Sequence, residues 1–134
     1  MVLHIQLLNH LFLFAKMIRY DIIPYDNTEK IIYSLIINKP LEELSIINGL
    51  HENLEYFIEW LEEDIINQNI PDYSFEGQIE FQPILFGSKK SKIAEFKNGQ
   101  YIAGQEFDTI EFLEVCKAWQ FFLIHHKKET LHKQ

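Results

Sequence analysis

The chain has 134 residues, 47% of them hydrophobic and 14% aromatic, which is the composition of one globular domain and not of a disordered segment. Its formal net charge of −8 disfavours nucleic acid as a partner and favours a basic protein. Cys116 is the single cysteine and cannot form an internal disulfide, so we expect a reducing compartment, most simply the cytoplasm.

The chain begins with an apolar run over residues 1–16. This run lacks the positively charged start of a secretory signal and is too short to span a bilayer, so we expect no membrane partner. We interpret it as an apolar N-terminal extension, or as a misassigned start with Met17 as the true one. The expected single domain covers residues 17–128, and residues 129–134 are a polar tail.

Two strands are expected first. Apolar and polar residues alternate over 17–25, which is typical of a strand with one wet face. Residues 29–38 allow two interpretations, a helix capped by Thr28 or a strand paired with 17–25, and their β-branched content favours the strand. Pro40 ends this segment, and a short acidic turn is expected over 41–49.

The longest amphipathic pattern in the chain predicts a helix over residues 50–67. Its apolar residues form one stripe, with Trp60 on one shoulder. The stripe consists of Leu50, Leu54, Phe57, Ile58, Leu61 and Ile65. Glu52, Glu59 and Glu63 lie opposite, with Glu55 and Glu62 on one flank. These five glutamates are termed the acidic ridge.

Residues 73–86 are expected to form one strand anchored by Phe75, Ile79, Phe81 and Ile84, with Gly77 and Pro83 indicating a bulge or an edge position. A basic loop over 87–92 follows. Asn98-Gly99 then predicts a tight hairpin turn, because both residues accept positive φ angles.

The last predicted helix begins at Asp108, which forms a capping box with Glu111. One broad apolar stripe is expected to be buried, and a second apolar set lies on the far side, as in helices that are sandwiched or form subunit contacts. The buried stripe consists of Phe112, Val115, Cys116, Trp119, Phe122 and Leu123. The far side carries Ile110, Phe121 and Ile124. Together these elements predict an α+β fold, an antiparallel sheet of about four or five strands with two main helices packed on it.

No residue pattern indicates catalysis or a cofactor. His125, His126, His132 and Glu129 cluster near the end of the chain, but adjacent histidines on a helix point in different directions and are poor joint metal ligands. Cys116 lies on the buried stripe, where a thiol is inert. His51 has no nucleophile beside it, and phosphate-binding glycine motifs are absent. We expect no metal, no cofactor and no enzymatic activity.

The acidic ridge extends over about 16 Å of helix, and no lysine or arginine lies between Leu50 and Asn67 to neutralise it. We therefore expect it to bind a basic protein surface, such as that of a nuclease, which must bind phosphate. Tyr and Trp are residue types that anchor interfaces. The predicted partner-binding residues are Glu52, Glu55, Tyr56, Glu59, Trp60, Glu62 and Glu63.

The helix that contains Asn53-Leu-Glu-Tyr-Phe-Ile-Glu-Trp-Leu61, followed by a β section and a closing helix with Phe112-Leu-Glu-Val-Cys-Lys-Ala-Trp-Gln-Phe-Phe122, resembles small bacterial immunity proteins. Such proteins are encoded beside polymorphic or contact-dependent growth inhibition toxins. The resemblance covers roughly residues 17–128 and implies a cytoplasmic, non-enzymatic protein that binds a cognate toxin domain and blocks its active site or an adjacent exosite.

Two other functions stay open. The far side of the last helix would suit an interaction or regulatory module that self-associates, so the chain is expected to be a monomer or a weak homodimer. A small enzyme would need a concave pocket with convergent polar groups.

Overall fold

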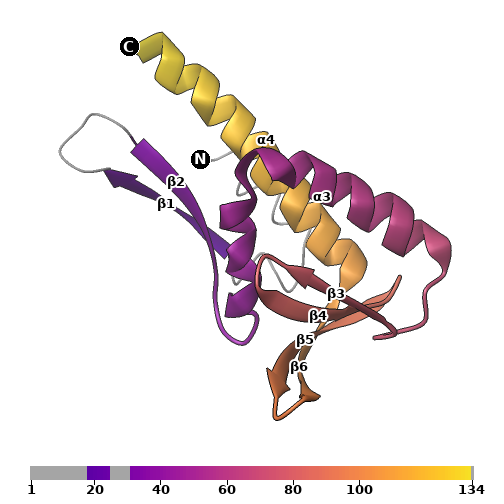
Figure 1. Cartoon of the computed structure of the whole chain (residues 1–134). Helices are drawn as coiled ribbons and strands as arrows, with labels where there is room; N and C mark the ends of the chain where they lie inside the picture. The colour runs from indigo at the N-terminus through magenta and orange to yellow at the C-terminus, as the bar shows by residue number, and fades with distance from the viewer. Residues whose placement is uncertain (1–17, 25–30, 134) are drawn as a thin grey trace.

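The computed structural model describes the backbone of residues 18–24 and 31–133 (Figure 1). The interpretation of residues 1–16 and of the start at Met17 lies outside these residues. In chain order the strands and helices are β1 (Ile18–Pro24), β2 (Ile31–Ile37), η1 (Glu42–Asn53), α3 (Leu54–Trp60), η2 (Leu61–Ile65), η3 (Ile66–Gln68), β3 (Phe75–Ile79), β4 (Gln82–Phe86), β5 (Lys90–Lys97), β6 (Gln100–Asp108) and α4 (Thr109–Lys133).

The predicted α+β fold is confirmed, and its strands form two antiparallel sheets. β3, β4, β5 and β6 follow one another in a four-stranded sheet, and β1 pairs with β2 in a separate two-stranded sheet. Figure 1 shows α3 and α4 running side by side above the four-stranded sheet. The segment predicted as a polar tail continues α4, whose backbone is helical as far as Lys133.

The first two strands are confirmed, and a short helix covers the open edge of β2. β1 and β2 pair from Ile18 opposite Ile37 to Pro24 opposite Ile31. On the other edge, the Leu35 N–H donates to Asn48 Oδ1 and the Ile37 N–H to Ser45 Oγ, each over 2.8 Å. The Asn48 amide donates in turn to the carbonyl oxygens of Leu35 and Ser45. These long-range bonds explain why residues 41–49, predicted to be a turn, are instead part of the 3₁₀ helix η1.

We predict that Asn48→Ala lowers the free energy of unfolding by about 2–3 kcal/mol, because it leaves backbone groups of Leu35 without partners in a partly buried position. Urea denaturation followed by circular dichroism measures this change. Asn67→Ala, at an exposed position in η3, is the control and should change stability by less than about 0.5 kcal/mol. Equal effects of the two substitutions would contradict the role assigned to Asn48.

The predicted helix over 50–67 begins later than its periodicity indicates. His51 has φ 47° and ψ −119°, which breaks the helical path, and α3 starts at Leu54. The helix continues through one π-helical segment, η2, and one 3₁₀ turn, η3, and ends at Asn69 in the left-handed conformation. Its predicted apolar stripe is confirmed. Leu54, Ile58, Leu61 and Ile65 are buried, and Leu50 and Phe57 pack partly buried against the same core.

The single strand predicted over 73–86 is wrong, because two strands and a tight turn occupy it. Ile79 of β3 lies opposite Gln82 of β4, so Glu80 and Phe81 alone form the turn. Ile79 and Ile84 are buried as predicted, whereas Phe75 is 41% exposed and Phe81 is 94% exposed.

The Asn98-Gly99 hairpin is confirmed, with φ angles of 51° and 77° in the turn between β5 and β6. The predicted basic loop over 87–92 is corrected. β5 already begins at Lys90, and Ser88 and Ser91 are buried. The Ser88 hydroxyl donates to the Ile65 carbonyl oxygen over 2.6 Å. The Ser91 and Thr109 hydroxyls are 2.7 Å apart, which joins the start of β5 to the start of α4.

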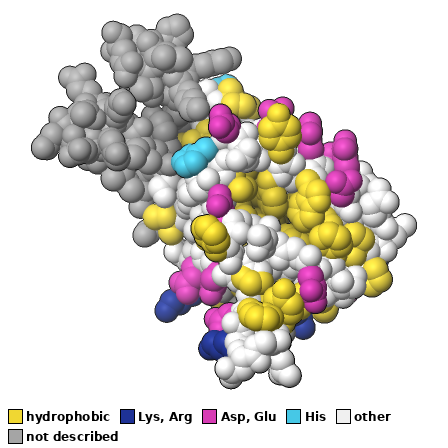
Figure 2. Space-filling view, in the orientation of Figure 1, with side chains coloured by type: hydrophobic (Ala, Val, Ile, Leu, Met, Phe, Trp, Pro, Cys, Tyr) yellow, Lys and Arg dark blue, Asp and Glu magenta, His cyan; other side chains and the backbone are white. Residues whose placement is uncertain are grey.

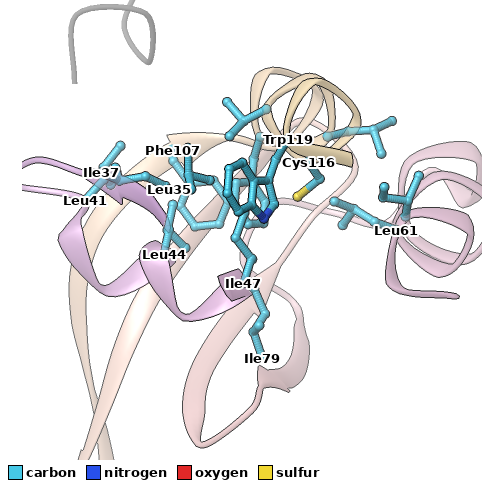
Figure 3. Packing of buried hydrophobic residues seen from close by; sticks show 14 of the residues in the cluster. Leu35, Ile37, Leu41, Leu44, Ile47, Leu61, Ile79, Phe107, Cys116 and Trp119 are labelled. Atoms are coloured by element: carbon cyan, nitrogen blue, oxygen red, sulfur yellow. The ribbon is translucent and has the colours of Figure 1, made fainter. Parts of the chain in front are cut away.

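α4 begins with half of the predicted capping box. The Glu111 N–H donates to Asp108 Oδ1 over 3.0 Å, but Glu111 Oε2 is buried without a hydrogen-bond partner. The predicted buried stripe is confirmed, with Leu123 only partly buried. Figure 3 shows Cys116 and Trp119 of α4 among core side chains that include Leu35 of β2 and Ile47 of η1. One hydrophobic core therefore unites both helices, η1 and the two sheets.

Candidate partner-binding surface

Four of the five acidic-ridge carboxylates are exposed. Glu52 lies at the end of η1, Glu55 and Glu59 lie on α3, and Glu63 lies on η2. The helix places them outward because the opposite stripe fills the core. These four glutamates are termed the acidic face. Figure 2 shows Asp and Glu side chains along the upper right of the molecule, where α3 lies in Figure 1.

The acidic face is not neutralised by the lysines whose side chains the structure describes. The ion pairs that these residues form join Lys90 to Glu106 and Asp108, and Lys97 to Glu95. Another joins Lys117 to Glu62, and none reaches the four glutamates of the acidic face. Like charges three or four positions apart on a helix repel by about 0.2–0.5 kcal/mol per pair. The folded chain therefore carries a small electrostatic strain on this face that a basic surface would relieve.

Glu62, the fifth member of the acidic ridge, is occupied within the fold. Lys117 Nζ on α4 donates to Glu62 Oε2 over 2.7 Å, and both side chains are about half-buried. This hydrogen bond is the main reason why the pKa of Lys117 is raised. We therefore leave Glu62 out of the acidic face.

The two predicted aromatic anchors differ in how much of the ring is accessible. Tyr56 is 70% exposed beside Glu55 and Glu59. Trp60 is half-buried, and its ring centroid lies 5.1 Å from that of Phe86 and 6.0 Å from that of Phe75. Through these ring contacts Trp60 packs α3 against the sheet. Tyr56 is therefore the more accessible of the two side chains for contact with a partner protein.

The structure places the side chains of three of the predicted candidates for chemistry, Cys116, His51 and His125. Cys116 is fully buried, and burial raises the pKa of its thiol far above the usual range. His51 is exposed at the kink, and the ring of His125 lies tilted against that of Phe121 with centroids 4.1 Å apart. The described residues contain no group of three or more His, Cys, Asp or Glu side chains placed to hold a metal ion. The side chains of His126, Glu129 and His132 lie outside the description.

Two of the three lysines in the predicted basic loop, Lys89, Lys90 and Lys92, form contacts within the fold. Lys90 forms the two ion pairs given above, and Lys92 Nζ lies 4.1 Å from the centroid of the Tyr73 ring. Tyr73 donates its hydroxyl proton to Glu106, and this bond is the main cause that raises the pKa of Tyr73 to about 12. Lys90 and Lys92 therefore stabilise the start of β5 and are only partly exposed, whereas Lys89 is exposed.

A depression of about 240 Å³ lies between η1 and the β5–β6 pair. Its ionisable lining residues are Glu43 and Glu95, and Glu95 is paired with Lys97 over 3.2 Å. The depression is smaller than most small-molecule sites, and neither Cys116 nor a histidine lines it. The described lining of this depression therefore offers two carboxylates and one side-chain amide, but no thiol, hydroxyl or imidazole group.

None of the helices in the described residues combines the length and apolarity that crossing a bilayer requires. No protein-family model matches the chain, and comparisons with curated proteins and with solved structures find no match.

Proposed function

We infer that this protein is a cytoplasmic, non-enzymatic immunity protein that binds and neutralises a basic bacterial toxin domain. The observation that carries the proposal is the acidic face, four exposed glutamates without an ion-pair partner among the described side chains, next to the exposed ring of Tyr56. The resemblance of the two aromatic-rich helices to immunity proteins of polymorphic toxins supports the same function.

The charge of the face suits the partner that such proteins neutralise. A nuclease toxin binds phosphate with lysine and arginine, and a row of carboxylates is complementary to that surface. Complementary charge accelerates association, and a rigid aromatic side chain such as Tyr56 supplies the contact that slows dissociation. Binding would cover the phosphate-binding surface of the toxin and thereby exclude its substrate.

The direct test uses the toxin domain encoded by the adjacent gene, purified on its own and titrated with this protein by isothermal calorimetry. We expect a one-to-one complex with a dissociation constant on the order of nanomolar, as in other protein inhibitors of enzymes. We also expect loss of toxin activity at equimolar inhibitor. Association should slow as the salt concentration rises. Failure of that domain to bind at micromolar concentration would refute the proposal.

The second candidate function is self-association through α4. Ile110 and Ile124 are each about half exposed, and Phe121 lies between them on the same side of the helix with 37% of its surface exposed. Such a stripe would be covered in a homodimer. Light scattering during size-exclusion chromatography decides this, because a dimer has twice the chain mass of 16.0 kDa. If Ile124→Glu converts a dimer into a monomer, α4 is the contact, and a wild-type monomer at high concentration removes this candidate.

A further inference from the structure

The β3–β4 turn presents an aromatic side chain almost entirely to solvent. Phe81 is 94% exposed, more than any other large hydrophobic side chain among the described residues. It is the second residue of a two-residue turn, directly after Glu80. An apolar ring at such a position gains nothing from burial in the folded chain, and almost its whole surface is accessible to another molecule.

Two other exposed phenylalanines have ring neighbours, which Phe81 lacks in the described part of the chain. Phe96 is 60% exposed, but it faces Tyr101 across the β5–β6 hairpin with ring centroids 5.2 Å apart. Phe75 contacts Trp60 in a tilted arrangement, with ring centroids 6.0 Å apart. Cross-strand and helix–sheet contacts of this kind stabilise a fold. Within the described side chains no ring contact of Phe81 is found, so a structural role does not account for it.

The strands on either side of the turn that carries Phe81 are anchored in the core. Glu80 adopts φ 53°, a conformation in which glycine or asparagine is far more common, and the buried side chains of Ile79 and Ile84 anchor the two strands. The Glu80 side chain also lies against η1, because a Cβ atom added at Gly49 would be 3.2 Å from Glu80 Oε1. Phe81 therefore lies in a turn whose flanking strands are packed in the core and whose Glu80 side chain contacts η1.

The same contact joins the turn to η1, the element that also carries Glu52. Gly49 and Glu52 lie on opposite sides of the kink at His51. Glu80 and Glu76 are exposed on the hairpin, and the ion pairs of the described residues include neither. An apolar ring thus directly follows Glu80, on a hairpin that also exposes Glu76 and that contacts the element carrying Glu52.

We propose that Phe81 is the apolar anchor of the toxin-binding surface and inserts into a hydrophobic pocket on the basic partner, whose lysine or arginine rim meets Glu80 and the acidic face. The inference rests on the proposed function and adds a second element, the β3–β4 hairpin, to the contact. The charge of the surroundings selects the partner, since a pocket with an acidic rim would be repelled. Large rings that fill a desolvated pocket are the residues that dominate binding energy in such interfaces.

The test titrates the purified toxin domain of the adjacent gene with wild-type protein and with three variants. Phe81→Ser should raise the dissociation constant by about 30-fold or more, the change expected when an interface hot spot is truncated. Phe81→Leu should restore most of the affinity, because leucine also fills an apolar pocket. Phe96→Ser is the matched control on the other hairpin and should bind within about twofold of wild type.

Three readouts separate the outcomes. Thermal unfolding of Phe81→Ser should match wild type because the side chain is exposed. Its loss of affinity should appear in the dissociation rate and persist at high salt, unlike a loss of charge. If the wild type does not bind, the proposed function fails and this inference fails with it. If the wild type binds and Phe81→Ser binds within threefold of it, the inference alone is refuted.

Discussion

Leu61→Asp is expected to leave the domain unfolded at 25 °C. Leu61 is fully buried at the start of η2, within the core that joins both helices to the sheet. Truncation of a buried leucine removes about 2–5 kcal/mol of stability, and an unpaired buried carboxylate removes several more. Domains of this size are stable by only about 5–15 kcal/mol. Circular dichroism should show no cooperative thermal transition.

The control for this experiment lies two residues further along the same helix. Glu63→Lys reverses a charge at an exposed position and should change the free energy of unfolding by less than about 0.5 kcal/mol. A cooperative transition of Leu61→Asp at the wild-type midpoint would mean that the side chain does not belong to the core.

The double variant Glu59→Lys/Glu63→Lys is expected to lose at least about 100-fold in affinity for the toxin domain at low salt. Both carboxylates belong to the acidic face, and juxtaposed like charges at an interface oppose association by several kcal/mol. The defect should shrink between about 50 mM and 500 mM salt, since mobile ions screen exposed charges. Folding should be unaffected or slightly favoured, because repulsion along the helix is relieved. Surface plasmon resonance across this salt range measures both rate constants.

A second double variant separates the location of the charges from their number. Glu95→Lys/Glu114→Lys changes the net charge by the same amount, at exposed positions on β5 and α4. It should retain most of the affinity, apart from a modest decrease in long-range attraction. Unchanged binding by Glu59→Lys/Glu63→Lys would reject the acidic face as the contact, whatever the control shows.

The sequence was most informative where local and tertiary preferences agree. The Asn98-Gly99 turn accepts positive φ angles by itself, so its hairpin could be predicted from two residues. The apolar stripes of α3 and α4 repeat at helical spacing, and the same residues fill the core. The division of residues 73–86 was missed because Glu80-Phe81 has no turn chemistry. A length of 14 residues is, however, more than twice that of an average strand, and this signal indicates a hairpin.

Structural features that depend on residues far apart in the sequence could not be predicted from the local spacing of apolar and polar residues. The 3₁₀ helix η1 is fastened by hydrogen bonds from Asn48 and Ser45 to β2, which no local pattern encodes. The angular spacing predicted the exposure of the acidic face correctly. It did not reveal that Lys117, 55 positions away, pairs with Glu62, or that Phe86 partly covers Trp60. Phe81, predicted as an anchor of the single strand over 73–86, is exposed because it lies in the unpredicted turn.

The hydrogen bonds that Ser45 and Asn48 make to β2 also bear on how the protein behaves at high concentration. An uncovered strand edge is a template for the strand of another molecule, and such additions lead to aggregation. Here two polar side chains take up the outward backbone groups of Leu35 and Ile37, which a foreign strand would otherwise engage. The short helix therefore protects the β2 edge of the two-stranded sheet without an additional strand.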